Sequence, residues 1–219
     1  MKLFELEESI GEIVQDSSFD GTQTRRLINR AIQSIAGAVD LPELVKTDTV
    51  LTTGSSSSAS LPAAYMKGLF FVGSANQNRR IGDRIGYRSY NRFLRRWPDP
   101  ALDKAGPIVD VAVKGTSLVY QPCVADTLTL QFYRKPAALT GASDSVEAIP
   151  AHLQEGLIVN FVCREIYSRI EDGVEGKKVN TAYHAALYNQ ALSDLRDFIG
   201  QDDEPEYVQN ETEADPWPR

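Results

Sequence analysis

Residues 150–200 have the sequence PAHLQEGLIVNFVCREIYSRIEDGVEGKKVNTAYHAALYNQALSDLRDFIG, which predicts two helices joined by a glycine-bounded turn. The first helix is expected over residues 151–171, because apolar side chains recur there at three- and four-residue steps: Leu153, Leu157, Ile158, Phe161, Val162, Ile166 and Ile170. The second is expected over residues 178–199, capped by Asn180 or Thr181, with one apolar face formed by Tyr183, Leu187, Ala191, Leu195 and Phe198. Neither helix can bury its apolar stripe alone, so the pair requires a further helix.

That further helix is predicted in the N-terminal part of the chain. Residues 22–39 place six apolar side chains on one side, namely Leu27, Ile28, Ala31, Ile32, Ile35 and Val39. A shorter amphipathic helix is predicted at residues 3–14. We therefore expect a bundle assembled from both ends of the chain, in which Leu157, Phe161, Leu187 and Leu195 are buried against Leu27, Ile28, Ile32 and Ile35.

The central part of the chain changes to short apolar runs that predict β-strands. The strongest is TLTLQFY, residues 127–133, which alternates strictly between polar and apolar side chains. Further strands are expected at residues 49–53, 66–72, 108–113 and 117–121, and one or two helical turns at residues 89–97. The predicted fold class is α+β, a mainly α-helical bundle with a small inserted antiparallel β-subdomain of four to six strands. The expected parts are N-terminal helices at 1–45, the β-rich subdomain at 46–140, the helical hairpin at 141–200 and an extended acidic tail at 201–219.

The composition favours a structural protein over an enzyme. We expect no catalytic residues, no metal site and no cofactor, because the chain has no catalytic motif and its two histidines, His152 and His184, have no second ligand at useful spacing. Cys123 and Cys163 are expected to be buried free thiols. No apolar run is long enough to cross a membrane, and the acidic N-terminus does not resemble a secretory signal, so no membrane association is expected.

The formal charge of −7 is unevenly distributed along the chain. Residues 75–98 contain seven arginines and a single aspartate. The arginines are Arg79, Arg80, Arg84, Arg88, Arg92, Arg95 and Arg96. Four aromatic residues are interleaved with them, and basic residues beside aromatic rings can contact phosphates and stack on bases. The alternatives are an ordinary solvated face, or arginines that pair with acids of a neighbouring copy.

The last 19 residues, QDDEPEYVQNETEADPWPR, contain seven acids and three prolines. Such a segment cannot bury enough apolar surface to fold alone. Tyr207, Val208 and Trp217 are apolar anchors within it, so we expect the tail to dock on a partner in extended form. The alternative is a solubilising tail that has no partner.

Five segments, taken in order, carry a family resemblance: TQTRRLINRAIQSIAG (22–37), LPAAYMKGLFFVG (61–73), GPIVDVAVKGTSLVYQPCVADTLTLQFYRKPAALT (106–140), IPAHLQEGLIVNFVCREIYSRIEDG (149–173) and KKVNTAYHAALYNQALSDL (177–195). Together they resemble the head-to-tail adaptor (connector, or neck) proteins of tailed double-stranded DNA bacteriophages. The specificity lies in their order and spacing rather than in any one segment. The long β insertion is closer to the longer adaptors of short-tailed phages than to the smallest, mostly helical ones.

The resemblance implies a structural virion protein that forms a ring, usually of twelve copies, below the portal. It implies as partners the portal protein, a downstream tail component (nozzle, stopper or tail tube protein) and double-stranded DNA in the lumen. In such a ring, the seven arginines of residues 79–96 are expected to face the lumen or a neighbouring subunit. The location implied is the neck of the virion, after assembly in the host cytoplasm. The resemblance also implies that the C-terminus reaches the portal, so the expected portal-binding residues are Glu206, Tyr207, Val208, Trp217 and Arg219. The alternative function is that of a phage accessory protein that binds nucleic acid through residues 79–96.

Overall fold

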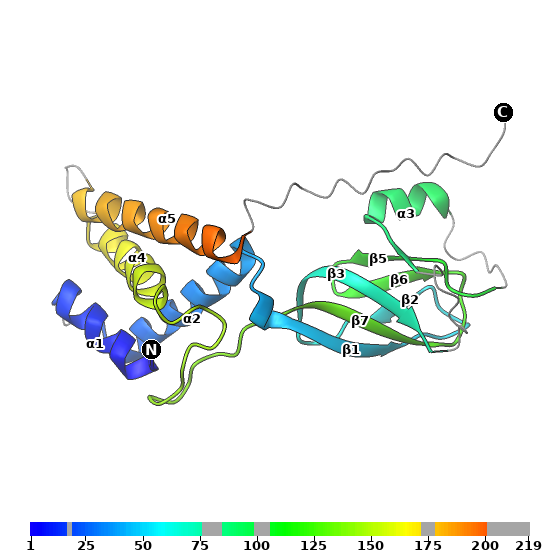
Figure 1. The fold of residues 1–219 in the computed structure, drawn as a ribbon, viewed down its shortest axis with the longest axis horizontal. Helices are drawn as coiled ribbons and strands as arrows, with labels where there is room; N and C mark the ends of the chain where they lie inside the picture. The colour runs from blue at the N-terminus through cyan, green and yellow to red at the C-terminus, as the bar shows by residue number, and fades with distance from the viewer. Residues whose placement is uncertain (17–18, 76–84, 99–105, 172–177, 201–219) are drawn as a thin grey trace. The chain divides into compact units, whose positions relative to one another are not determined.

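A computed structural model describes residues 1–16, 19–75, 85–98, 106–171 and 178–200 (Figure 1). The chain divides into two compact units. The helical unit comprises Met1–Leu41 and Ala137–Arg219, and the β unit comprises Pro42–Pro136. Each unit contains its own buried apolar side chains.

The described part of the helical unit is built from four α-helices and one π-helical turn. The α-helices are α1 (Leu3–Val14), α2 (Gly21–Ala38), α4 (Asn160–Ile170) and α5 (Val179–Ile199). Both N-terminal helices lie where the apolar periodicity predicts them. The Asp20 carboxylate accepts a hydrogen bond from the Gln23 N–H at 2.8 Å, which caps the start of α2. Gly200 ends α5 in the left-handed conformation (φ 76°) that glycine adopts without strain.

The helix predicted at residues 151–171 is not a uniform α-helix. It begins with the π-helical turn η2 (Glu155–Val159) and continues as α4. The side-chain amide of Asn160 donates to the Gly156 carbonyl at 2.8 Å, satisfying an acceptor within this widened turn. The apolar pattern of the sequence did not indicate this change of helical pitch, which coincides with the Asn160 side-chain hydrogen bond.

The core of the helical unit contains most of the predicted side chains but not Leu187. Leu157, Phe161 and Leu195 are buried, as are the predicted residues of α2, whereas Leu187 is 39% exposed. The prediction of the α5 face is thus wrong in part, since Tyr183 and Phe198 are also exposed. The helix instead buries His184, Tyr188, Ala191 and Leu195. Aromatic packing explains the rotation: Tyr167 stacks on His184 with centroids 5.4 Å apart, and Phe161 meets Tyr188 edge-on at 5.4 Å.

The start of α5 is capped from the end of α4. The Glu171 carboxylate accepts hydrogen bonds from the Asn180 N–H (3.0 Å), the Thr181 N–H (3.2 Å) and the Thr181 hydroxyl (2.7 Å). The bond from the Thr181 hydroxyl, with those from the two backbone N–H groups, holds the pKa of Glu171 below its usual value. The expectation that Asn180 or Thr181 caps this helix is therefore corrected, because both residues donate to an acceptor from another helix.

The described strands of the β unit form two sheets. The three-stranded sheet has the order β1 (Val45–Leu51), β7 (Thr127–Arg134), β3 (Tyr65–Ser74), and its pairs are antiparallel. The four-stranded sheet has the order β2 (Ser58–Ser60), β6 (Ser117–Gln121), β5 (Asp110–Lys114), β4 (Gly86–Tyr87). In this sheet β4 and β5 are parallel and the other pairs are antiparallel. Their buried side chains form one cluster that includes Val72, Val111, Tyr120, Leu130 and Phe132.

The expected fold, a mainly α-helical bundle with a small β-subdomain, is wrong. The protein is α+β, and seven described strands in two sheets give the β unit a core of its own. The prediction underestimated this unit for a physical reason. Strands β2 and β4 have three and two residues, too few to show a two-residue alternation. Strand β1 begins at Val45, within a mostly polar run that has no strong strand signal.

Candidate functional site: the arginine surface of helix α3

The arginine-rich stretch includes a short helix that is attached to the β unit by one buried ring. The β unit begins with the short 3₁₀-helix η1 (Pro42–Leu44). Helix α3 (Tyr90–Arg96) follows strand β4 in the chain. Phe93 is fully buried and clusters with Ala112 of β5 and Val119 of β6. Tyr90 and Trp97 pack against this cluster. Phe93, with Tyr90 and Trp97 beside it, thus orients the helix so that Arg92 and Arg95 lie at exposed positions.

A buried carboxylate connects the segment before α3 with the end of the helix. Asp110, the first residue of β5, is only 1% exposed. Its Oδ1 accepts a hydrogen bond from Arg88 Nε at 2.8 Å, and its Oδ2 contacts Arg96 Nε at 3.1 Å and accepts from Trp97 Nε1 at 3.0 Å. A buried charge requires paired and hydrogen-bonded partners, and each of these described partners flanks or belongs to α3. Asp110 therefore holds both ends of the helix against the strand.

Gly86 provides the space that this arrangement needs. A Cβ atom at this position would lie 2.9 Å from Asp110 Oδ1, closer than ordinary contacts allow. Asp110 was not among the predicted site residues. The available signal was a lone acid in the otherwise apolar run IVDVAV, residues 108–113. An unpaired carboxylate is not tolerated in a buried strand, so it indicated a basic partner.

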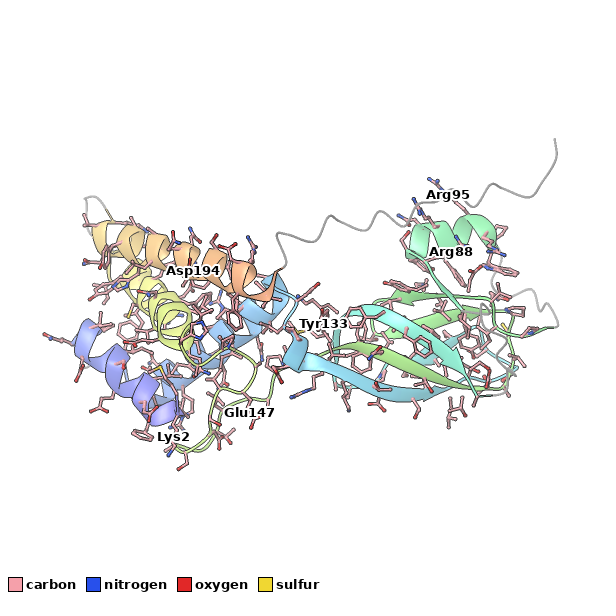
Figure 2. The ribbon with its side chains drawn as sticks, viewed as in Figure 1. Lys2, Arg88, Arg95, Tyr133, Glu147 and Asp194 are labelled. Atoms are coloured by element: carbon pink, nitrogen blue, oxygen red, sulfur yellow. The ribbon has the colours of Figure 1, made fainter. Side chains whose placement is uncertain are left out.

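The structure divides the seven predicted arginines into three groups. Arg88 and Arg96 bind Asp110, and their side chains remain 39% and 48% exposed. Arg92 and Arg95 lie on exposed positions of α3, and Figure 2 shows the Arg95 side chain pointing away from the sheets of the β unit. The other three, Arg79, Arg80 and Arg84, lie outside the described residues. The seven are therefore not brought together as one observed cluster.

We use the term α3 surface for Arg92, Arg95 and Arg96 together with Tyr90, Trp97 and Lys114. Cations of the chain itself cover both aromatic rings: Lys114 Nζ lies 5.3 Å from the Tyr90 ring centroid, and the Arg96 guanidinium 5.8 Å from that of Trp97. Residues 85–98 and 106–121 contain five arginines and lysines and one acid, Asp110. The surface is therefore strongly positive, and its rings are already engaged.

The positive charge of the protein is concentrated in the β unit. Pro42–Pro136 contains 13 arginines and lysines and 7 acids, a net charge of +6. The rest of the chain contains 10 arginines and lysines and 23 acids, a net charge of −13. The formal charge of −7 for the whole chain conceals this separation, which gives the two units opposite signs.

The other candidate residues have structural surroundings. His184 is buried, its Nδ1 lies 2.9 Å from Asn160 Oδ1, and burial lowers its pKa. His152 packs edge-on against Phe198 with centroids 5.1 Å apart. Both cysteines are free, but only Cys163 is buried, and burial raises its pKa to about 12.

Within the described residues, no group of His, Cys, Asp and Glu side chains is arranged to hold a metal ion. No helix in this part of the chain is long and apolar enough to cross a membrane. The expected portal-binding residues, Glu206, Tyr207, Val208, Trp217 and Arg219, lie outside the described residues.

Comparison with known proteins identifies the family of the chain. No curated protein matches the chain. The model of the SU10 adaptor protein family matches residues 1–212, which include the whole of the β unit and all described residues of the helical unit. The resemblance to phage head-to-tail adaptors is confirmed at this level. The chain therefore belongs to the SU10 adaptor protein family and is a structural adaptor of a bacteriophage virion.

Proposed function

We propose that this protein forms a ring, of twelve copies, below the portal and joins the capsid to the tail, so that DNA passes through its lumen. The observation that carries the proposal is the family match over residues 1–212. The separation of charge between the two units supports it, because a ring subunit must present different, complementary surfaces to its two neighbours. The role is mechanical and requires neither a catalytic group nor a cofactor.

The tail is the proposed portal-binding segment. Tyr207 and Trp217 enter apolar pockets of the portal, and the acids between them face basic residues. Ordering an extended segment costs conformational entropy, so a few anchors must supply most of the affinity. The acids contribute a part that is sensitive to salt. The opposite end of the ring receives the downstream tail component, and assembly takes place in the host cytoplasm.

The α3 surface faces the lumen or a neighbouring subunit in this ring. Contacts to passing DNA must be weak, because the DNA has to move through the ring. Asp110 neutralises part of the charge of Arg88 and Arg96. The remaining attraction to phosphates falls as salt rises. Partial neutralisation by Asp110 and a salt-sensitive attraction to phosphates suit a lumen that attracts DNA without retaining it.

Electron microscopy of the protein mixed with purified portal rings tests the proposal. The full chain should add a ring of density to the portal. A variant ending at Gly200 should keep its helix content by circular dichroism and fail to attach. The matched control replaces Glu211 and Glu213 by Gln and keeps Tyr207 and Trp217, and it should still attach at low salt. A folded full-length protein that adds nothing to the portal would overturn the proposal.

The second candidate is an accessory nucleic-acid-binding protein, and the positive α3 surface is the observation in its favour. Measurements of duplex DNA affinity and of assembly on portals distinguish the two candidates. A monomer that binds duplex DNA tightly at physiological salt, and that does not associate with portals, supports the second. A protein that assembles on portals and binds free DNA only weakly supports the first.

A further inference from the structure

We propose that the α3 surface is a contact between neighbouring copies in the ring, occupied by the acidic outer face of α1 of the next copy. This inference rests on the proposed ring and assigns one of its contacts. The outer face of α1 is defined by Phe4, Glu8 and Glu12, which recur at four-residue steps. All three side chains are exposed.

The symmetry of a ring requires two different surfaces at each contact. A surface that pairs with itself produces a two-fold dimer, whereas a ring requires a head-to-tail contact between unlike surfaces. The β unit, with a net charge of +6, and the acidic remainder of the chain are unlike in this sense. Two β units placed face to face would repel each other. A β unit against the helical unit of the next copy would attract it.

Helix α1 is the most one-sided acidic element of the helical unit. Its twelve residues contain four glutamates and no lysine or arginine. Glu5 accepts the Lys2 N–H at 2.8 Å, and Glu7 pairs with Arg25 at 3.1 Å. Among the ion pairs between described residues, none involves Glu8 or Glu12. Like charges four residues apart destabilise a helix, so an opposite charge from outside would relieve a cost that the free subunit carries.

The α3 surface complements this face in charge and in spacing. Arg92 lies one helical turn before Arg95 and Arg96, and Glu8 likewise lies one turn before Glu12. Two ion pairs can therefore form in parallel between two helices. Arg96 contacts Asp110 through Nε and keeps a half-exposed side chain, so Asp110 orients it without removing it from the surface. Phe4, 45% exposed and one turn before Glu8, adds an apolar contact.

The observations favour a protein partner over DNA at this surface. Single-stranded nucleic acid binds aromatic rings by base stacking, but Lys114 and Arg96 already lie over the rings of Tyr90 and Trp97. Only phosphate contacts remain for DNA. Glu8 and Glu12 of α1, by contrast, form no ion pair with a described residue. Charge pairs of this kind set register and partner choice more than affinity, so the contact should weaken as salt rises.

A charge exchange between separate copies tests the contact. One variant carries Glu8→Arg and Glu12→Arg, and the other carries Arg92→Glu and Arg95→Glu. Each alone has like charges on both of its proposed surfaces, so each should form at least ten-fold fewer portal-bound rings than the wild type. In an equimolar mixture every contact can again join opposite charges, and twelve is an even number, so rings of alternating copies should form. Arg26→Glu, at an exposed position of α2, is the control for a change of net charge and should leave assembly unchanged.

The outcomes are distinguishable from those of the proposed function. A wild-type protein that forms no ring on portals overturns both the proposed function and this contact. Wild-type rings together with unimpaired rings of either variant overturn the contact alone. Variants that fail singly and remain inactive when mixed also overturn it, provided that circular dichroism shows them folded. Loss of DNA affinity in the Arg92→Glu, Arg95→Glu variant, with assembly intact, would assign the surface to DNA. Restored rings in the mixture confirm the contact, because only paired surfaces on different copies can produce them.

Discussion

Replacement of Asp110 by Asn should destabilise the β unit and release α3 from strand β5. The substitution removes a buried negative charge and keeps the size of the side chain. The amide retains one acceptor oxygen, and its NH₂ group must then face an N–H donor of an arginine or of Trp97. Arg88, Arg96 and Trp97 therefore lose at least part of their common acceptor.

The magnitude follows from three contacts and their exposure. Hydrogen bonds that involve a charged group contribute about 1.5–3 kcal/mol each, and neutral ones about 1 kcal/mol. The two arginine side chains are 39% and 48% exposed, so water replaces part of what they lose, and each is discounted to about 1 kcal/mol. The Trp97 bond, whose acceptor is charged, adds about 1.5–3 kcal/mol. Because the amide of Asn keeps one acceptor, worth about 1 kcal/mol, the expected loss of unfolding free energy is about 2.5–4 kcal/mol. For a unit of this size that corresponds to a decrease in the midpoint of thermal unfolding of roughly 10–30 °C.

Trp97 provides the assay, because the chain has only one other tryptophan, Trp217. In a Trp217→Phe background, fluorescence in a urea titration reports on α3. Circular dichroism at 222 nm follows mainly the helical unit and should change little. The matched control is Asp48→Asn, which removes another ion-paired aspartate of the β unit. Asp48 lies 3.0 Å from Lys46 Nζ with 36% of its side chain exposed, so its loss should cost below about 1 kcal/mol. Equal midpoints for the Asp110 and Asp48 variants would refute the anchoring role of Asp110.

Three further outcomes are expected in the helical unit and at the cysteines. Phe161→Ala should cost roughly 3–5 kcal/mol by urea unfolding followed at 222 nm, since it removes a buried ring and leaves a cavity; an unchanged midpoint would show that the ring is not in the core. Burial lowers the pKa of His184, so the imidazole binds a proton more readily in the unfolded chain than in the native protein. The free energy of unfolding should therefore fall as the pH decreases from the unfolded-state pKa of about 6.5 through the native pKa. His184→Gln should reduce this slope between pH 7.5 and 5.5, and an identical slope would contradict the assignment. A thiol reagent at pH 8 should label Cys123 first and reach Cys163, with its pKa raised to about 12, only on unfolding; Cys123→Ser should remove the fast phase.

Local periodicity was sufficient to predict several elements from the sequence. Helices α1, α2 and α5 lie within one residue of their predicted bounds, because an apolar stripe at helical spacing is a property of a single segment. The hairpin of β5 and β6 was equally predictable, since Gly115, with φ 60°, provides the left-handed turn between two apolar runs. The family resemblance also came from the sequence, through the order of its segments.

Contacts between distant segments were decided only by the tertiary structure. The sequence offers two apolar faces on α5, and stacking of Tyr167 on His184 accompanies the choice of the buried one. Glu171 caps a helix that begins eight residues later, which no local cap pattern indicates. Asp110 lies 14 residues from Arg96 and meets it only because Phe93 holds α3 against β5. The role of a charged residue depends on the partner that folding brings next to it. The amphipathic spacing of a helix, by contrast, is already present in the sequence before the chain folds.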